Sequence, residues 1–486
     1  MKGSKPLTVV IKLGTSSIVD EKTHEPLLSI LSLIVETAVK LRKDGHKVVI
    51  VSSGAIGVGL RRMDVDRRPK HLSKLQALAA IGQCRLISLW DSLFAHLQQP
   101  ISQILLTRND IADRSRYLNA QTCMAELLDM GVIPIVNEND TLAVAEIKFG
   151  DNDTLSAITA AMVHADFLFL MTDVDCLYDK NPRTHPDAKP IEEVEDIGAI
   201  QADVSSAGSS LGTGGMGTKI VAARLATSAG VTTVITRSSS PGNIIKIVRY
   251  LQATKGMKAS ASQSSLSQIN HITEESTAVA TPAETPPHPI AYPALDALAL
   301  EEPPLHTRFL PLSTPIRDRY FWLLHGLAPH GTLYIDAGAH AALSDKAGLL
   351  PVGVLDVEGN FAQQEAVRLV VVDRRAAPAA AHADMNTSSS STPRSSTPVP
   401  VSAKWESCNP VEVGRALVNY AAPEIARIKG HRSGKIGELL GYADSEYVAH
   451  RENISLSRRE SRPVSPVPNI AANIGGVAGY EAGSIM

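Results

Sequence analysis

The sequence predicts an α/β fold, a largely parallel sheet sandwiched by helices, which is followed by a small β-rich domain. Across residues 7–251, short apolar runs alternate with segments that have the apolar spacing of helices. Each apolar run ends in small, polar or acidic residues, and open α/β sheets bind ligands at that edge. After an interval rich in Ser, Thr, Ala and Pro, strand-like runs return between glycine turns.

Composition narrows the class of protein. A chain of 486 residues is long enough for two or three domains, and its 44% hydrophobic content is that of a globular protein. The net charge of −3 excludes a global field that steers the molecule to nucleic acid or to an acidic membrane surface. No apolar run reaches the roughly 18 residues of a membrane span, and the amino terminus lacks the apolar stretch of a secretory signal. We therefore expect no membrane contact and a cytoplasmic location.

Cysteine spacing argues against a disulfide framework and against a zinc site. The cysteines are widely spaced and form no CxxC pair: Cys84, Cys123, Cys176 and Cys408. This usage is typical of a reducing compartment, which agrees with a cytoplasmic location.

The elements of the first domain follow from the apolar periodicity and from the glycine and polar breaks. Predicted strands cover residues 7–13, 47–51, 101–107, 132–136, 167–171 and 232–236. Predicted helices cover residues 28–41, 73–98, 118–130, 154–164 and 220–229. Because strand and helix alternate, we expect a largely parallel sheet with helices on both faces.

Changes of composition set the expected domain boundaries. Residues 1–257 form the α/β domain, and residues 258–305 are a linker that is predicted to be disordered. Residues 306–454 form the β-rich domain with a low-complexity insertion over residues 376–401, and residues 455–486 form an unstructured tail. The strands predicted early in the second domain cover residues 320–324, 332–336, 352–357 and 366–373.

Two acid-amide clusters, at residues 136–140 and 149–153, follow the predicted strand 132–136. Their side chains are expected to emerge together at the carboxyl end of the strand, where a ligand binds. Asn152 or Asp153 is also a candidate N-cap of the following helix, which is the structural alternative for half of this motif. One cap does not require so many Asp and Asn side chains, so we favour a polar ligand.

Two lysines and a glycine-rich loop suit phosphate groups. Four glycines between Gly212 and Gly217 precede Lys219 at the start of a helix, where backbone N–H groups and the helix N-terminus favour an anion. The loop is not a Walker A sequence, because Thr218 stands where that motif has glycine. Lys12 lies inside an apolar strand, and a buried ammonium group needs an anion. The alternatives are a flexible surface loop and a lysine whose side chain reaches solvent.

Asp173 and Asp175 end another strand at the same edge of the sheet. Either can orient a nucleotide or bind Mg²⁺ through water, although Asp173 also fits an ordinary turn. Phosphoryl transfer needs positioning and charge neutralisation more than a general base. A carboxylate acceptor is already ionised at neutral pH, so it requires no catalytic histidine. The residues together indicate phosphoryl transfer to an acceptor held by the Asp and Asn cluster.

Six segments of the first domain share their order and spacing with one known family. They are VIKLGTS at residues 10–16, VSSGAI at 51–56, LLTR at 105–108, VNEND at 136–140, GDND at 150–153 and GTGGMGTK at 212–219. They resemble glutamate 5-kinase, of the amino acid kinase superfamily. Three segments of the second domain resemble the PUA domain that is attached to many of these enzymes: GTLYIDAG at 331–338, VEGNF at 357–361 and GELLGY at 437–442. The resemblance implies an amino acid kinase fold followed by a PUA-like domain.

The resemblance also implies ATP-dependent phosphorylation of the γ-carboxylate of L-glutamate, the first step of proline synthesis, with feedback inhibition by proline. By motif match, the residues that hold glutamate are Ser53, Asn137, Asp140, Asn152 and Asp153. The residues that serve ATP are Lys12, Thr172, Asp173, Thr213, Gly214, Gly215, Met216, Gly217, Thr218 and Lys219. The catalytic candidates among them are Lys12, Lys219 and Asp153. The two lysines would neutralise charge on the transferred group, and Mg²⁺ would bridge the nucleotide phosphates without an assigned protein ligand.

The partners that the resemblance implies are a second copy of the chain, in a homo-oligomer, and glutamyl phosphate reductase as the downstream enzyme. The PUA-like domain adds RNA as a partner that the sequence leaves open, because a cluster of basic residues beside glycines is more often a solvated surface. The basic residues concerned are Lys429, His431, Arg432 and Lys435.

Two rival functions remain open at this point. One is another amino acid kinase, with aspartate, acetylglutamate or a nucleotide as the acceptor. The other is an RNA-binding regulatory protein whose kinase half is vestigial. Intact Lys12, Asp153 and Lys219 argue against the second rival.

Overall fold

The computed structural model describes residues 6–142, 152–200, 215–254, 302–372, 401 and 405–457. The chain forms two compact units, Met1–Ala328 and Pro329–Met486. The predicted linker and most of the predicted insertion and tail lie outside the described residues.

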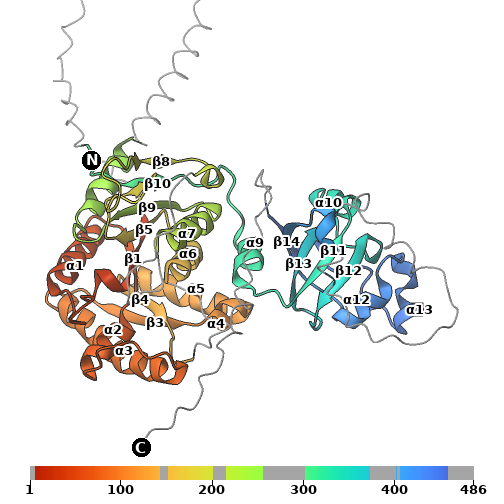
Figure 1. The fold of residues 1–486 in the computed structure, drawn as a ribbon, viewed down its shortest axis with the longest axis horizontal. Coiled ribbons are helices and arrows are strands. Elements are labelled where there is room, and N and C mark those ends of the chain that lie inside the picture. The colour runs from red at the N-terminus through yellow and green to blue at the C-terminus, as the bar shows by residue number, and fades with distance from the viewer. Residues whose placement is uncertain are drawn as a thin grey trace, which may run out of the picture. The chain divides into compact units, whose positions relative to one another are not determined.

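The first unit is built on an eight-stranded sheet in the order β3-β4-β2-β1-β5-β9-β10-β8 (Figure 1). Its strands are β1 (Thr8–Leu13), β2 (Lys47–Ser52), β3 (Ile101–Leu106), β4 (Ile133–Glu138), β5 (Phe167–Thr172), β8 (Glu193–Val194), β9 (Thr232–Arg237) and β10 (Thr307–Phe309). The strands from β3 to β9 in this order are parallel, and β10 is antiparallel to β9. The predicted largely parallel sheet is therefore confirmed. A hairpin of β6 (Leu177–Tyr178) and β7 (Pro190–Ile191) lies outside it.

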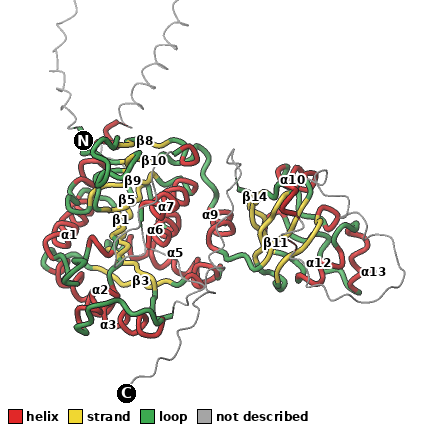
Figure 2. The backbone as a smooth tube through the Cα atoms, in the orientation of Figure 1, coloured by secondary structure: helices red, strands yellow, loops and turns green. Residues whose placement is uncertain are grey.

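Helices cover both faces of this sheet (Figures 1 and 2). They are α1 (Leu28–Lys43), α2 (Ala55–Arg62), α3 (Leu72–Ala95), α4 (Arg108–Ala112), α5 (Arg114–Asp129), α6 (Asn152–Met162) and α7 (Met216–Ser228). Residues 243–254 are also helical. One continuous apolar core joins α1, α3 and the helix at 243–254 to the sheet, while α5, α6 and α7 pack on the opposite side. The sandwich predicted from the alternation of strand and helix is present.

Strand β1 shows how the sequence divides its side chains between these two layers. Successive side chains of a strand point to opposite faces. Val9, Ile11 and Leu13 are fully buried in the core that includes α1 and α3. Lys12 therefore points to the other face, where α6 and α7 begin. The one charged residue of this apolar strand therefore lies on the face of the sheet where α6 and α7 begin.

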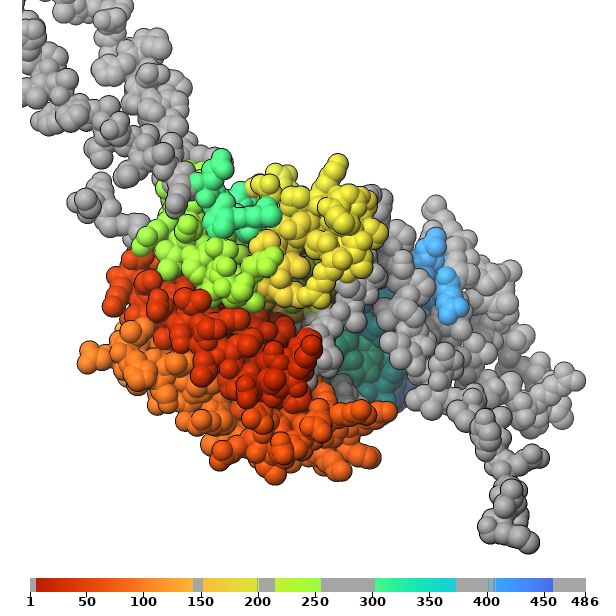
Figure 3. Space-filling view, turned by 60° about the vertical axis from the view of Figure 1, so that its left-hand side comes forward, coloured from red at the N-terminus to blue at the C-terminus, as the bar shows by residue number. Residues whose placement is uncertain are grey.

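Residues 302–328 complete the first unit. Strand β10 pairs with β9, and Figure 3 shows the teal surface of this segment against the green surface of residues 215–254. The next residues run along the end of α7, where the amides of Leu312 and Ile316 donate to the carbonyls of Thr227 (3.1 Å) and Ser228 (2.9 Å). The compact first unit extends to Ala328.

A short helical segment closes the first unit. It consists of α9 (Asp318–Phe321) and a π-helical turn at Trp322–Gly326. The strand predicted at residues 320–324 is therefore wrong. A short apolar run cannot be told from a buried helical segment by periodicity alone, and here its burial on α4 and α5 decides the outcome.

Trp322 anchors this segment to α4 and α5. Its indole N–H donates to the carbonyl of Ile111 at 2.8 Å, and its ring is 6% exposed. The guanidinium of Arg114 lies 5.3 Å from the Trp322 ring and 5.4 Å from the ring of Tyr117. The Tyr117 hydroxyl in turn donates to Asp318 at 3.2 Å. A large apolar surface and a cation held between two aromatic rings therefore fix the segment.

The second unit has a five-stranded sheet in the order β12-β11-β13-β14-β15. Its strands are β11 (Gly331–Ile335), β12 (Val354–Gly359), β13 (Ala366–Val371), β14 (Val411–Leu417) and β15 (Ile454–Leu456). Its main helices are α10 (Ala337–Ser344), α12 (Ala422–Ile428) and α13 (Ile436–Leu440). Of the predicted strands, those at 332–336, 352–357 and 366–373 correspond to β11, β12 and β13, so the small β-rich domain is confirmed.

The basic residues near α12 are not equivalent. Lys429 forms an ion pair with the largely buried carboxylate of Asp356, which gives this lysine a structural partner. His431, Arg432 and Lys435 are exposed. In the part of the chain that the structure describes, no helix combines the length and the apolar composition needed to cross a bilayer.

We predict that Trp322→Ala lowers the free energy of unfolding by about 3–5 kcal/mol, because it removes a buried aromatic side chain and leaves a cavity. Arg317→Ala, an exposed position on the same segment, should change this free energy by no more than about 0.5 kcal/mol. Urea unfolding followed by circular dichroism measures both. Equal effects of the two substitutions would contradict the docking of this segment.

Candidate functional site

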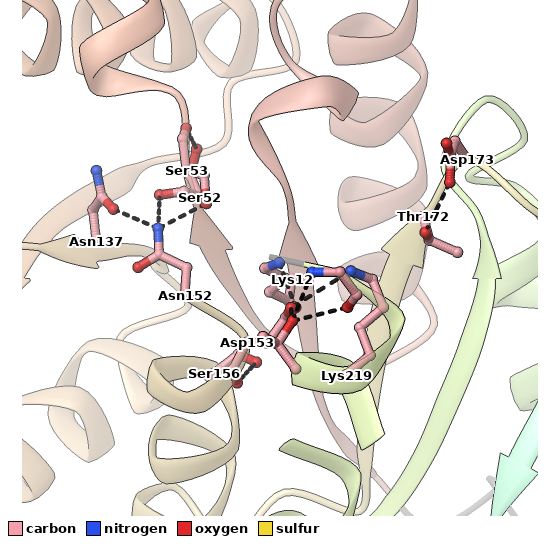
Figure 4. Close-up of polar contacts among 12 residues, drawn as sticks. Lys12, Ser52, Ser53, Asn137, Asn152, Asp153, Ser156, Thr172, Asp173 and Lys219 are labelled. Atoms are coloured by element: carbon pink, nitrogen blue, oxygen red, sulfur yellow. Dashed lines mark hydrogen bonds and ion pairs between the residues drawn. The ribbon is translucent and has the colours of Figure 1, made fainter. Parts of the chain in front are cut away.

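Polar side chains from distant parts of the sequence meet at the carboxyl ends of the central parallel strands (Figure 4). Lys12 lies near the end of β1, Ser53 follows β2, and Asn137 lies in β4. Helices α6 and α7 begin at the same place, and they bring Asp153 and Lys219. The convergence predicted from the strand ends is confirmed for these residues.

Asp153 is the centre of a buried cluster of charges. One of its carboxylate oxygens forms an ion pair with the ammonium group of Lys12, and the other lies 3.5 Å from the ammonium group of Lys219. Asp153 is fully buried, Lys12 is 3% exposed and Lys219 is 7% exposed. Two lysines therefore share one carboxylate away from bulk solvent.

Electrostatics keep this carboxylate charged. Burial by itself would raise the pKa of Asp153, but the positive charges of Lys12 and Lys219, and hydrogen bonds from Lys12 and Thr218, lower the pKa to about 2. Asp153 is consequently ionised at neutral pH. An ionised aspartate cannot donate a proton, and here both of its oxygens are engaged by the two ammonium groups.

The start of α7 is tied to the same carboxylate. The Thr218 hydroxyl donates to Asp153 at 2.7 Å and accepts from the backbone N–H of Gly215 at 3.0 Å. The first N–H groups of a helix have no partner within the helix and carry partial positive charge. Met216 and Gly217 lie in this first turn. Lys219 and the first turn of α7 thus present positive charge together, which suits a phosphate group.

A second cluster, made of amides and hydroxyls, lies beside the charged one. The amide N–H groups of Asn152 donate to the hydroxyl of Ser53 at 2.8 Å and to the side-chain oxygen of Asn137 at 3.0 Å. Asn137 donates in turn to the side-chain oxygen of Gln83 at 2.8 Å. The side-chain oxygen of Asn152 is buried and has no hydrogen-bond partner among the described residues. A buried acceptor without a partner is costly, and a ligand donor would remove that cost.

Thr172 and Asp173 lie apart from both clusters, at the end of β5 (Figure 4). The Thr172 hydroxyl donates to Asp173 at 3.2 Å, and Asp173 forms an exposed ion pair with Arg183. Asp175 forms a bidentate pair with Arg237, with distances of 2.6 and 2.7 Å. These carboxylates belong to salt bridges at the surface and do not contact the buried cluster.

Some of the remaining predicted residues are described by the structure and others are not. Thr213 and Gly214, and the segment 149–151 of the second acid-amide cluster, lie outside the described residues. Asp140 is half-buried and follows β4. The described part of α6 begins at Asn152, and the side chains of Asn152 and Asp153 bond to residues outside this helix, Asn152 to Ser53 and Asn137 and Asp153 to Lys12 and Lys219. Both lie inside its first turn.

Sequence reasoning missed Gln83 and Ser52. Gln83 lies on α3, far along the chain from the other members, and no pattern in the sequence marks it. Ser52 accepts from the indole N–H of Trp90 at 3.3 Å and presents its carbonyl to Asn152 at 3.4 Å. The sequence shows two adjacent serines at the end of β2, but it does not show that Ser52 contacts Trp90.

Two family models match the chain. The model of the amino acid kinase family matches residues 7–237, and that of the PUA domain matches residues 331–390. The first range holds every described residue of both clusters. The second begins at β11 and lies within the second unit.

Three relatives match nearly the whole chain. A protein of Schizosaccharomyces pombe, named probable glutamate 5-kinase, is 50% identical over 92% of this chain and 93% of its own length. An uncharacterized protein of Saccharomyces cerevisiae is 44% identical, with 93% of this chain and 99% of its own length covered. Glutamate 5-kinase of Rippkaea orientalis is 39% identical over the same shares. The match extends through both units.

We predict that Asp153→Asn lowers the free energy of unfolding at neutral pH by about 3–5 kcal/mol, because the two buried lysines lose the carboxylate that they share. The folded-state pKa of about 2 lies below the ordinary value of 3.8. The charged carboxylate therefore stabilises the fold at every pH above about 4, and this contribution disappears as the pH falls toward about 2.

Urea unfolding at a series of pH values tests this prediction. The difference between the unaltered chain and Asp153→Asn should be constant above about pH 4 and narrow below it. Asp129→Asn is the control, because it breaks an exposed ion pair with Lys47 and should cost no more than about 1 kcal/mol. A difference that does not change with pH would contradict the role of the charge.

Proposed function

We propose that this chain, which belongs to the glutamate 5-kinase family and contains an amino acid kinase domain and a PUA domain, phosphorylates the γ-carboxylate of L-glutamate with ATP. The reaction is the first step of proline biosynthesis. Family membership supports the activity, and the arrangement of the two clusters supports the roles that we assign to individual residues.

One observation carries the assignment: a buried pair of lysines on one carboxylate lies directly beside a buried acceptor on Asn152. Lys12 and Lys219 suit a group that gains negative charge during the reaction, and Asn152 suits a group that donates hydrogen bonds. A phosphoryl group fits the first description and the ammonium of an amino acid fits the second. A kinase that phosphorylates an amino acid binds both a phosphoryl group and an ammonium group.

The chemistry needs little from the protein beyond position and charge. The γ-carboxylate of glutamate is already ionised at neutral pH, since its ordinary pKa is about 4.3. One of its oxygens attacks the γ-phosphorus of ATP, a new O–P bond forms, and the bond from phosphorus to the bridging oxygen of ADP breaks. Lys12 and Lys219 stabilise the charge on the transferred group. Asp153 holds both lysines, and no proton has to move.

On the acceptor side, we assign the ammonium of glutamate to the side-chain oxygen of Asn152. Ser53 and Asn137 hold Asn152 in place. Asp140, which follows β4, supplies a negative charge for the same ammonium. A substrate without this ammonium leaves the Asn152 oxygen without a donor, and the cost of that loss gives the site its selectivity.

ATP use follows from the kinase family, and we propose Mg²⁺ as its companion. Among the described residues, no group of three or more His, Cys, Asp or Glu side chains converges on one point. We propose that Mg²⁺ arrives on the nucleotide, because Mg²⁺ keeps several waters and commonly binds substrate phosphates. Bound there, the ion supplies charge neutralisation between the phosphates. Thr172 and Asp173, at the end of β5, are the proposed contacts for the nucleotide away from its reacting end.

Four partners are proposals of the same kind. Proline, with its own carboxylate and ammonium, suits the glutamate side of the site and is the proposed feedback inhibitor. A homo-oligomer and a reductase that consumes the acyl phosphate complete the proposal. For the PUA domain, RNA remains the proposed partner of the exposed His431, Arg432 and Lys435, since Lys429 is engaged with Asp356.

A trapping assay tests the activity against its rivals. The chain is supplied with ATP, Mg²⁺, hydroxylamine and one acceptor at a time, and the hydroxamate formed from an acyl phosphate is measured. We expect product from glutamate and little from aspartate or acetylglutamate. Product from another acceptor alone would replace the proposed substrate, and no ATP turnover with any acceptor would favour a vestigial kinase.

We predict that Lys12→Met lowers kcat about 10²–10³-fold, because it removes one charge that stabilises the transferred group. The KM for glutamate should change far less. Lys40→Met is the matched control, because the ammonium of Lys40 is on the surface, 3.5 Å from Glu36, and its loss should leave kcat unchanged. A loss expressed mainly in the KM for glutamate would assign Lys12 to substrate binding instead.

A further inference from the structure

The orientation of the Asn152 amide decides what the acceptor side can bind. If the oxygen of Asn152 is the atom left without a partner, the amide can accept a hydrogen bond from a ligand, whereas a free NH₂ group at that position would donate one. The structure places the NH₂ group on Ser53 and Asn137, which leaves the oxygen for a ligand. Something must hold the amide this way around.

A line of three amides sets this direction. The NH₂ group of Asn152 donates to the oxygen of Asn137 at 3.0 Å, and the NH₂ group of Asn137 donates to the oxygen of Gln83 at 2.8 Å. Every amide has an oxygen that accepts and an NH₂ group that donates, and Asn137 uses both within the line. The direction of Asn137 is therefore linked to the oxygen of Gln83 on one side and to the NH₂ group of Asn152 on the other.

Backbone groups favour the same direction for Asn137 and Asn152, the two members that lie beyond Gln83. The N–H of Glu138 donates to the oxygen of Asn137 at 2.9 Å, and a backbone N–H can only donate. The carbonyl of Ser52 lies 3.4 Å from the NH₂ group of Asn152, and a carbonyl can only accept. If Asn137 were reversed, its NH₂ group would face two donors, from Glu138 and Asn152. The observed direction is the one that leaves no two donors together.

A close contact between helices places Gln83 at the end of this line. A side-chain carbon at the neighbouring Gly82 would lie 1.8 Å from the carbonyl oxygen of Ala55 and 2.6 Å from the backbone nitrogen of Gly59. Glycine at position 82 thus allows α3 to lie directly against the start of α2, just after Ser53. This contact brings Gln83 within reach of Asn137.

We propose that Gln83 is a positioning residue that sets the direction of the Asn137 and Asn152 amides, and so selects acceptors with a free ammonium group. The proposal rests on the assignment of glutamate to this site. Gln83 itself does not touch the substrate in this scheme. If the side-chain oxygen of Gln83 is removed, the NH₂ group of Asn137 loses its acceptor. Fewer hydrogen bonds then hold the Asn137 and Asn152 amides in the observed orientation.

The test compares two substitutions of nearly equal size. Gln83→Met removes the acceptor, whereas Gln83→Glu keeps an oxygen in the same place. The measurements are the KM for glutamate, the KM for ATP and the inhibition constant of glutarate, which is glutamate without its amino group. Glutarate cannot donate to Asn152, so it reports on the rest of the site.

We expect Gln83→Met to raise the KM for glutamate about tenfold, the size of one hydrogen bond, while the glutarate constant and the KM for ATP stay within about twofold. Gln83→Glu should stay within about threefold of the unaltered chain for glutamate. Equal losses for glutamate and glutarate, or a loss in Gln83→Glu as large as in Gln83→Met, would overturn the proposal.

Gln83→Ala, which removes the same acceptor from a half-buried position, replaces Gln83→Met if that variant folds poorly, and the same expectations apply. Thermal unfolding monitors the fold of each variant. Absence of glutamate turnover in the unaltered chain would overturn the proposed function together with this inference. Normal turnover with an unchanged preference in Gln83→Met would overturn only the inference.

Discussion

The buried carboxylate of Asp153 is the constraint on which the rest of the first unit depends. Burying a charge costs several kcal/mol unless partners replace the lost water, and here the partners come from two other elements, Lys12 of β1 and Lys219 of α7. The Thr218 hydroxyl completes the set. Because removing any one member exposes the others to that cost, strand β1 and the first turns of α6 and α7 are held in one arrangement.

The first turn of α6 divides the site in two. Asn152 and Asp153 are consecutive in a helix, so their side chains point about 100° apart. Asn152 reaches the amides beside β2 and β4, whereas Asp153 reaches the lysines beside β1 and α7. Two neighbouring residues thus separate the part of the site that recognises the acceptor from the part that handles charge, and the rigid helix fixes the distance between them.

Much of the fold and of the site is predictable from the sequence, and the limits have physical reasons. Apolar runs that end in polar residues predict parallel strands and a common edge, so the amino-acid order alone places Lys12, Ser53 and Asn137 together. Partners across the fold are not predictable in this way, because sequence spacing does not say that Gln83 on α3 meets Asn137. The strand predicted at residues 320–324 is wrong because burial, which decides between helix and strand in short apolar runs, comes from the surface on which the run packs.

The pairing of β10 with β9 shows how residues 255–301 connect parts of the chain. Strand β9 precedes this interval and β10 follows it, and the two strands pair in one sheet, so both ends of the interval lie in the same compact unit. A single backbone cut there would leave two fragments that remain paired through β9 and β10, and the folded unit would survive as a nicked, non-covalent complex.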